Sequence, residues 1–85
     1  MEIRLTRSFE RDYRELPNII KKAVDKKLLL LLDNFRHSSL QVKKMEGYKN
    51  VWEARINQGF LFTFSIFDKT YVIRRVGKHD ILKKP

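Results

Sequence analysis

The side chains best suited to chemistry lie near the end of the sequence. Residues 74–84 contain five basic side chains and one acid. Within this stretch Gly77 allows a sharp turn of the backbone, which would bring His79 beside a neighbouring strand. Histidine can release a proton near neutral pH, and the surrounding cations would attract an anion. The segment therefore predicts a site for a phosphate-bearing substrate. Its phosphate-binding candidates are Arg75, Lys78, Lys83 and Lys84.

Two more candidates lie on residues 51–56, where apolar and polar side chains alternate. Alternate side chains of a strand share a face, so Glu53 and Arg55 point the same way. A carboxylate base, an acid such as His79 and a cation such as Arg55 are the groups needed to cleave RNA by its own 2'-hydroxyl. Such chemistry needs no metal. Since His37 and His79 without a carboxylate cluster make a poor metal site, we expect no cofactor.

Each of these residues also has a structural interpretation. A lone histidine is more often structural than catalytic, and Glu53 and Arg55 could simply pair with neighbours on an exposed sheet. Lys43 and Lys44 add positive charge on the approach to the same face. Both lysines could instead mark a charged sheet edge that discourages the addition of another strand. The residues alone leave these alternatives open.

Leu61 does not fit the pattern of its strand, residues 60–67. Alternation puts the phenylalanines of this strand on the apolar side and Leu61 on the other side with Thr63. We expect that second side to be the open face of the sheet, which Glu53 and Arg55 share. A large apolar residue is unusual among such neighbours, although a single exposed leucine is common on protein surfaces.

Two helices and several strands are predicted to position these residues. Residues 2–5 alternate as a short strand at a sheet edge, and Thr6 or Ser8 then caps a helix that ends just before Pro17. Pro17 suits the first position of a second helix of about five turns, with apolar residues every three or four positions through Phe35. Strands follow at residues 40–45, 51–56, 60–67 and 71–76. The order predicts an α+β fold, in which an N-terminal helical hairpin packs on one face of a small twisted antiparallel sheet.

Length and composition limit the class of protein. A chain of 85 residues forms a single domain, residues 1–85. Its net charge of +9 predicts a polyanionic partner, and ten of the 19 basic residues but only four of the ten acids follow residue 42. Without cysteine, stability must come from packing, which fits a cytoplasmic protein. The longest apolar run, residues 28–32, is far shorter than the roughly 20 residues that span a bilayer, so we expect no membrane partner.

Three short motifs, in this order, resemble the RelE/ParE toxin superfamily over essentially the whole chain. They are residues 51–56, the stretch Gly59-Phe60-x-Phe62-Thr63-Phe64, and residues 74–82, which include Gly77-Lys78-His79-Asp80-Ile81-Leu82. The resemblance is nearest the RelE-type branch. It implies a RelE-like fold and a toxin of a type II toxin–antitoxin system. Such a toxin enters the ribosomal A site and cuts the mRNA there, so the implied partners are the ribosome, mRNA and a cognate acidic antitoxin in a bacterial or archaeal cytoplasm.

The resemblance also assigns roles to single residues. Arg55 falls where RelE-type toxins place a basic group beside the scissile phosphate, and His79 falls where an Arg or His helps to protonate the leaving group. Glu53 would be the general base, with Lys44 or another basic group as a substitute. Leu61 departs from the family, which has an arginine there to grip the scissile phosphate. This departure predicts a weakened or inactive toxin.

Two other functions remain open on the sequence alone. One is a ParE-like inhibitor that blocks DNA gyrase by binding, without catalysis. The other is a non-catalytic RNA-binding module, which would fit both the basic surface and Leu61. An acid–base pair such as Glu53 and His79 favours the nuclease, because a pure inhibitor has no use for one.

Overall fold

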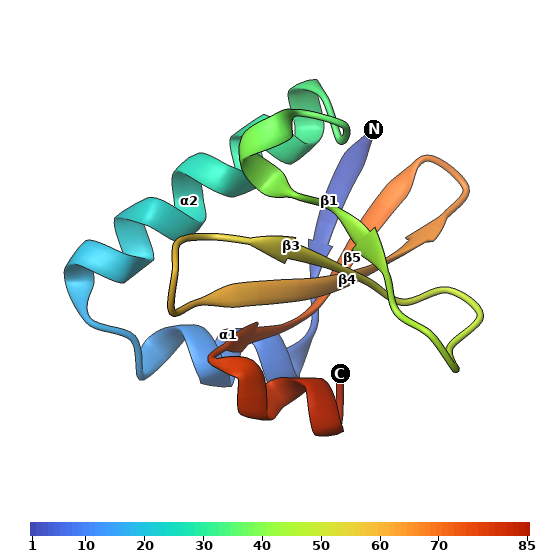
Figure 1. Ribbon diagram of the computed structural model, residues 1–85. Helices are drawn as coiled ribbons and strands as arrows, with labels where there is room; N and C mark the ends of the chain where they lie inside the picture. Colours follow the sequence, from blue (N-terminus) through green and yellow to red (C-terminus); the bar gives the residue numbers. More distant parts are fainter.

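The computed structural model describes residues 1–85, which form a five-stranded sheet and two α-helices (Figure 1). The strands are β1 (Glu2–Leu5), β2 (Lys43–Lys44), β3 (Trp52–Arg55), β4 (Leu61–Phe67) and β5 (Thr70–Gly77). The helices are α1 (Arg7–Arg14) and α2 (Asn18–Asp33), and two short 3-10 helices are η1 (Ser38–Leu40) and η2 (His79–Lys83). The predicted α+β fold with its N-terminal helical pair is confirmed.

The sheet is mixed rather than wholly antiparallel. Its strand order is β1-β5-β4-β3-β2, with β1 at one edge. Strands β2 to β5 pair antiparallel as predicted, whereas β1 runs parallel to β5. Short turns join β3 to β4 and β4 to β5, and such turns force antiparallel pairing. No turn joins β1 to β5, so local turn residues carry no information about the direction of β1.

The helix boundaries follow local chemistry, with small differences from the predicted ones. Thr6, and not Ser8, caps α1: its Oγ1 accepts a hydrogen bond from the Phe9 backbone amide at 3.0 Å. Pro17 is the N-cap of α2 rather than its first helical residue. Since α2 ends at Asp33, Phe35 lies beyond the helix, although it still packs against the core.

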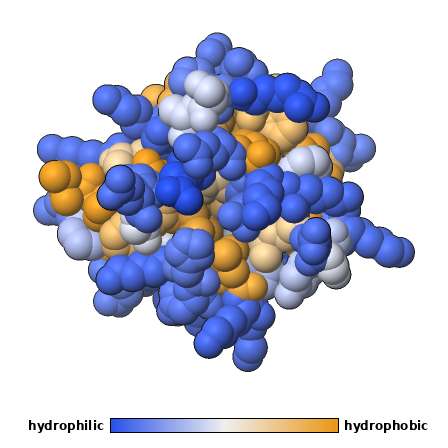
Figure 2. All heavy atoms as spheres, viewed as in Figure 1, coloured by the Kyte–Doolittle hydropathy of each residue, from blue (hydrophilic) through white to orange (hydrophobic).

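One face of the sheet forms the main core with the two helices. Phe9 of α1 and Val24 and Leu31 of α2 are buried together with Phe62 and Phe64 of β4. This is the face that the alternation of β3 and β4 predicts. Hydrophilic side chains cover most of the surface seen in Figure 2, with apolar atoms visible in patches between them. No helix has the length and apolar composition that crossing a membrane requires.

The second face of the sheet is covered over β4, so the prediction of an open face there is wrong. Leu61, Thr63 and Ser65 are only 7%, 0% and 1% exposed. The C-terminal segment, red in Figure 1, folds back over this face. The Pro85 backbone oxygen accepts hydrogen bonds from Thr63 Oγ1 at 3.4 Å and from Arg74 Nε at 3.0 Å. Small hydroxyl residues suit this position because they can be buried and still hydrogen-bonded.

An ion pair ties α1 to β5. Arg75 donates from Nε to Asp12 Oδ2 at 2.7 Å and from Nη2 to Asp12 Oδ1 at 3.1 Å. The same carboxylate accepts the Val76 backbone amide at 3.2 Å. The hydrogen bond to Asp12 raises the pKa of Arg75, burial acts in the opposite direction, and the charges of Asp12 and Asp80 add to the rise. Asp12 therefore anchors the helix to the strand that leads into η2.

Replacing Asp12→Asn should lower the free energy of unfolding by about 2 kcal/mol, because hydrogen bonds to a charged group are lost and the half-buried Arg75 loses its counter-charge. Urea unfolding followed by circular dichroism measures this change. The matched control is Asp25→Asn, which removes a carboxylate that accepts one exposed hydrogen bond from Tyr13. A loss no larger than that of the control would contradict the anchoring role.

Candidate nucleic-acid interface

The strand register brings half of the predicted site residues onto one face in two adjacent rows. In the first row Arg55 pairs with Leu61, and Leu61 pairs with Gly77. Directly paired residues of neighbouring strands project from the same face. The row therefore runs from the exposed Arg55 to the turn that leads into η2.

The second row lies two residues along the strands. Lys43 pairs with Glu53, Glu53 with Thr63, and Thr63 with Arg75. Glu53 is half-buried and Lys43 is exposed. The only ion pair in the structure is that of Arg75 with Asp12, so Glu53 is free of a fixed cation. Glu53 and Arg55 thus stand two residues apart on the same face, as predicted.

Lys44 lies on the opposite face from Lys43. Its Nζ is 6.0 Å from the centroid of the Trp52 ring, and Trp52 packs against the main core. Neighbouring residues of a strand alternate between faces, so only one lysine of the pair can face the two rows. Lys43, rather than Lys44, is the basic group beside Glu53.

Leu61 is buried beneath η2 instead of standing exposed among polar groups. It lies opposite Gly77, and a methyl group on Gly77 would be 2.9 Å from Cγ2 of Ile81, which is itself buried. Ile81 therefore sits over the end of β5 on the face that Leu61 shares. Leu61 and Ile81 are thus both buried on this face, which the alternation of β4 alone did not reveal.

The close approach of Ile81 to Gly77 leads to a testable prediction. Gly77→Ala should lower the free energy of unfolding by about 1–3 kcal/mol, because Ile81 and the start of η2 must shift to admit the methyl group. Gly59→Ala is the matched control, since its nearest neighbour would be an ordinary contact at 3.9 Å. Chemical denaturation of both variants measures the difference. Equal free energies of unfolding for the two variants would show that η2 can shift without loss of stability.

His79 is the first residue of η2 and is exposed. It follows Gly77 by two positions, so the chain delivers it to the end of the row that contains Arg55 and Leu61. No hydrogen bond joins His79 to Asp80. The negative charge of Asp80 instead helps to raise the pKa of Arg75. The preceding Lys78 places its Nζ 5.8 Å from the Phe60 ring centroid, toward the turn between β3 and β4.

Arg75 has fewer free donors than the sequence suggests. Its Nε and Nη2 bind Asp12, and its Nη1 donates to the Lys84 backbone oxygen at 3.2 Å. Three of the five N–H groups of an arginine are therefore used within the fold. Arg75 holds α1, β5 and the C-terminal segment together, and its charge is balanced by Asp12.

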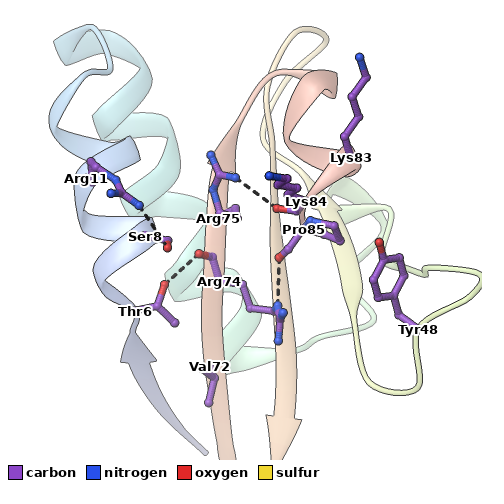
Figure 3. A pocket seen from close by; sticks show the side chains of 10 residues that line it. All are labelled: Thr6, Ser8, Arg11, Tyr48, Val72, Arg74, Arg75, Lys83, Lys84 and Pro85. Carbon is purple, nitrogen blue, oxygen red and sulfur yellow. Dashed lines mark hydrogen bonds between the residues drawn. The ribbon is translucent and has the colours of Figure 1, made fainter.

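A basic groove of about 660 Å³ opens beside these rows, between α1, β5 and the C-terminal segment (Figure 3). Lys83 and Lys84, two of the predicted phosphate-binding residues, line it. Arg11, Arg74 and Tyr48 also line it and were not predicted. Arg11 lies one helical turn after Ser8, so helical periodicity could have predicted that the two side chains share a face. Arg74 faces the groove because the β4–β5 register shifts between Thr63 and Phe64, an irregularity that no alternation shows.

No family model matches the sequence, and no curated protein matches it. Solved structures do match the fold. YafQ from E. coli strain BL21(DE3) superposes with a TM-score of 0.79 at 16% identity, covering 95% of this chain and 96% of that one. A YoeB/ParE toxin from Agrobacterium tumefaciens gives a TM-score of 0.80 at 13% identity, covering 93% and 99%.

A third match is to the RelB–RelE antitoxin–toxin complex from Methanococcus jannaschii, with a TM-score of 0.74, 19% identity and 95% coverage of both chains. The chain has the RelE/ParE toxin fold. Within this fold, the strand register puts Lys43, Glu53 and Arg55 on one face of the sheet, and His79 begins the η2 segment that follows β5.

Proposed function

We propose that this chain is the toxin of a type II toxin–antitoxin pair and an endoribonuclease that cuts mRNA in the ribosomal A site. The observation that supports it best is the row formed by Arg55, Leu61 and Gly77, with His79 at its end and Glu53 one row away. In this proposal His79, Glu53 and Arg55 supply an acid, a base and a cation close to one another on a basic protein. These groups suffice for cleavage by the substrate's own 2'-hydroxyl.

Each residue has one role in the proposed reaction. Glu53 accepts the proton of the 2'-hydroxyl as the 2'-oxygen attacks phosphorus, and the adjacent Lys43 is the alternative basic group. Arg55 stabilises the negative charge that develops on the phosphate oxygens. His79 donates a proton to the departing 5'-oxygen, which leaves a 2',3'-cyclic phosphate on the upstream fragment. Because Leu61 stands where a further cation would hold the phosphate, the activity of this chain is weak or absent.

The proposed partners follow from charge and from the structural matches. The net charge of +9 suits ribosomal and messenger RNA, to which basic side chains bind largely through phosphates. Other matching structures include the intact RelBE toxin–antitoxin complex of E. coli and a RelE–RelB complex from Pyrococcus horikoshii. By analogy, a cognate acidic antitoxin would neutralise this chain in the cytoplasm.

The test is to map mRNA breaks by primer extension in a reconstituted translation system, with and without ribosomes. Breaks at A-site codons that depend on the added protein, from this chain or from its Leu61→Arg variant, are the expected result. Absence of breaks from both proteins would contradict the nuclease. Ribosome-independent breaks would keep the nuclease but exclude the A-site mechanism.

A ParE-like gyrase inhibitor is the second candidate, because the fold is shared with a YoeB/ParE toxin. A supercoiling assay with purified DNA gyrase separates the two functions. Inhibition of supercoiling without RNA breaks would favour this alternative, whereas RNA breaks without inhibition would favour the nuclease.

A further inference from the structure

The basic groove shares only Arg75 with the two candidate catalytic rows and differs from them in its charge balance. Its lining includes five cationic side chains and no acidic one. The lining residues are Thr6, Ser8, Arg11, Tyr48, Val72, Arg74, Arg75, Lys83, Lys84 and Pro85. Only Arg75 among the five cations is paired with an acidic side chain. The groove therefore concentrates positive charge on a concave surface that adjoins the row of Glu53 and Arg75.

Arg74 is the cation of this groove that the fold holds in place. It is half-buried, and it donates from Nε to the Pro85 backbone oxygen at 3.0 Å and from Nη1 to Ser65 Oγ at 3.2 Å. The Ser65 hydroxyl in turn donates to the Asn50 backbone oxygen. The Asn50 side chain is fixed by two hydrogen bonds with the backbone of Ile66. Arg74 is thus oriented through a chain of contacts that reaches two other parts of the sheet.

In this orientation Arg74 keeps several N–H groups that make no hydrogen bond within the fold. Two of its N–H groups are used within the fold, out of the five that an arginine carries. Its acceptors are the Pro85 backbone oxygen and the Ser65 hydroxyl, whereas the neighbouring Arg75 binds the Asp12 carboxylate. Both arginines bind within the fold, but Arg74 uses fewer of its N–H groups there, so part of its guanidinium remains available in the groove. A guanidinium fork matches the oxygens of a phosphodiester.

Tyr48 indicates what kind of phosphodiester fits. It lies in the loop between β2 and β3, on the far rim of the groove from α1, and it is 42% exposed (Figure 3). An exposed aromatic ring beside a basic groove is the arrangement on which the bases of a single strand stack. Arg11 lines the α1 side, where its only hydrogen bond is a 3.4 Å contact with Ser8. A strand lying in the groove would have its backbone on Arg74 and a base on Tyr48.

We infer that this groove is a binding site for the sugar–phosphate backbone of single-stranded RNA, outside the scissile phosphate, with Arg74 and Tyr48 as its principal contacts. The inference rests on the proposed nuclease function for its biological role. The groove would hold the mRNA next to Glu53 and Arg55, so that binding and cleavage are carried by different residues. Arg74 and Tyr48 are binding and positioning residues in this scheme, not catalytic ones.

The test measures binding without cleavage. The probe is a fluorescently labelled 2'-O-methyl oligoribonucleotide of about ten nucleotides, which lacks the attacking hydroxyl, and its anisotropy is followed at several salt concentrations. Arg74→Gln should weaken binding about tenfold and reduce the slope of log affinity against log salt by about 0.7, the contribution of one phosphate contact. Tyr48→Ala should weaken binding about tenfold with little change in slope, and Tyr48→Phe should restore it.

The control is Lys26→Ala, which removes the same charge from the exposed surface of α2 and should change affinity less than twofold. Thermal unfolding of each variant reports whether it is folded. If Arg74→Gln does not fold, Tyr48→Ala and Arg11→Ala carry the test, because both side chains are exposed. Binding by all groove variants that equals the binding of the natural chain would overturn the inference.

Other outcomes separate the groove from the nuclease. If the chain binds the oligonucleotide through Arg74 and Tyr48 but cuts no mRNA, RNA binding in the groove is supported and the nuclease function is excluded. If the chain cuts mRNA, and the Arg74→Gln and Tyr48→Ala variants bind and cut as it does, RNA binding in the groove is excluded and the nuclease function is supported. Binding of a glutamate-rich peptide in place of the oligonucleotide would also overturn the inference, because the groove would then suit an acidic protein segment.

Discussion

Leu61→Arg is expected to raise A-site mRNA cleavage by about 100-fold, the usual effect of a charge-assisted contact with the developing negative charge of a transition state. The new guanidinium would emerge in the row between Arg55 and Gly77, next to the proposed position of the scissile phosphate. Leu61 is almost completely buried, near Ile81. The aliphatic part of an arginine can occupy that apolar space while its head group reaches solvent.

The measurement is the rate of appearance of A-site breaks in a reconstituted translation system, for the natural chain and the variant at equal concentration. Leu61→Met is the matched control, because it conserves volume without adding charge and should leave cleavage unchanged. Thermal unfolding checks that the buried substitution is tolerated. A folded Leu61→Arg variant with unchanged cleavage would contradict the hypothesis that an absent arginine weakens this chain.

His79→Ala, made in the Leu61→Arg background, is expected to lower cleavage by about 100- to 10,000-fold, since a positioned general acid contributes that much. The histidine is exposed and makes no hydrogen bond within the fold, so its removal should leave stability unchanged. His37→Ala is the matched control. That histidine is the N-cap of η1, and its Nδ1 has only local partners, the Ser39 amide at 3.2 Å and the Ser39 hydroxyl at 2.9 Å.

A second substrate tests the role of His79 as an acid. An mRNA with a 5'-bridging sulfur at the scissile position has a leaving group that departs without protonation. The His79→Ala variant should cut this substrate nearly as fast as its parent, because the missing proton is no longer required. Equal losses on the oxygen and sulfur substrates would show that His79 acts in another way, such as by binding RNA.

Local patterns in the sequence were sufficient for the elements and for the main core. The period of two in β3 and β4 assigned Ala54, Phe62 and Phe64 to the buried face, and that assignment is confirmed. Thr6 and Pro17 marked the starts of the helices, because capping and the missing amide of proline act within a single turn. Alternation also put Glu53 and Arg55 on one face, since the side chains of residues two apart in a strand project alike.

Only the tertiary structure decided which of the predicted site residues are free to act. Arg75 is held by Asp12, 63 positions earlier in the chain, and Leu61 is buried opposite Gly77, which Ile81 of the following segment approaches closely. Arg74 reaches the groove through a register shift against β4. These contacts join residues that are far apart in sequence. The local sequence pattern around each residue does not depend on its distant partner, so the pattern cannot predict the contact. Periodicity therefore determined the face on which each side chain lies, while the long-range packing of α1 and the C-terminal segment determined which cations remain available to an anion.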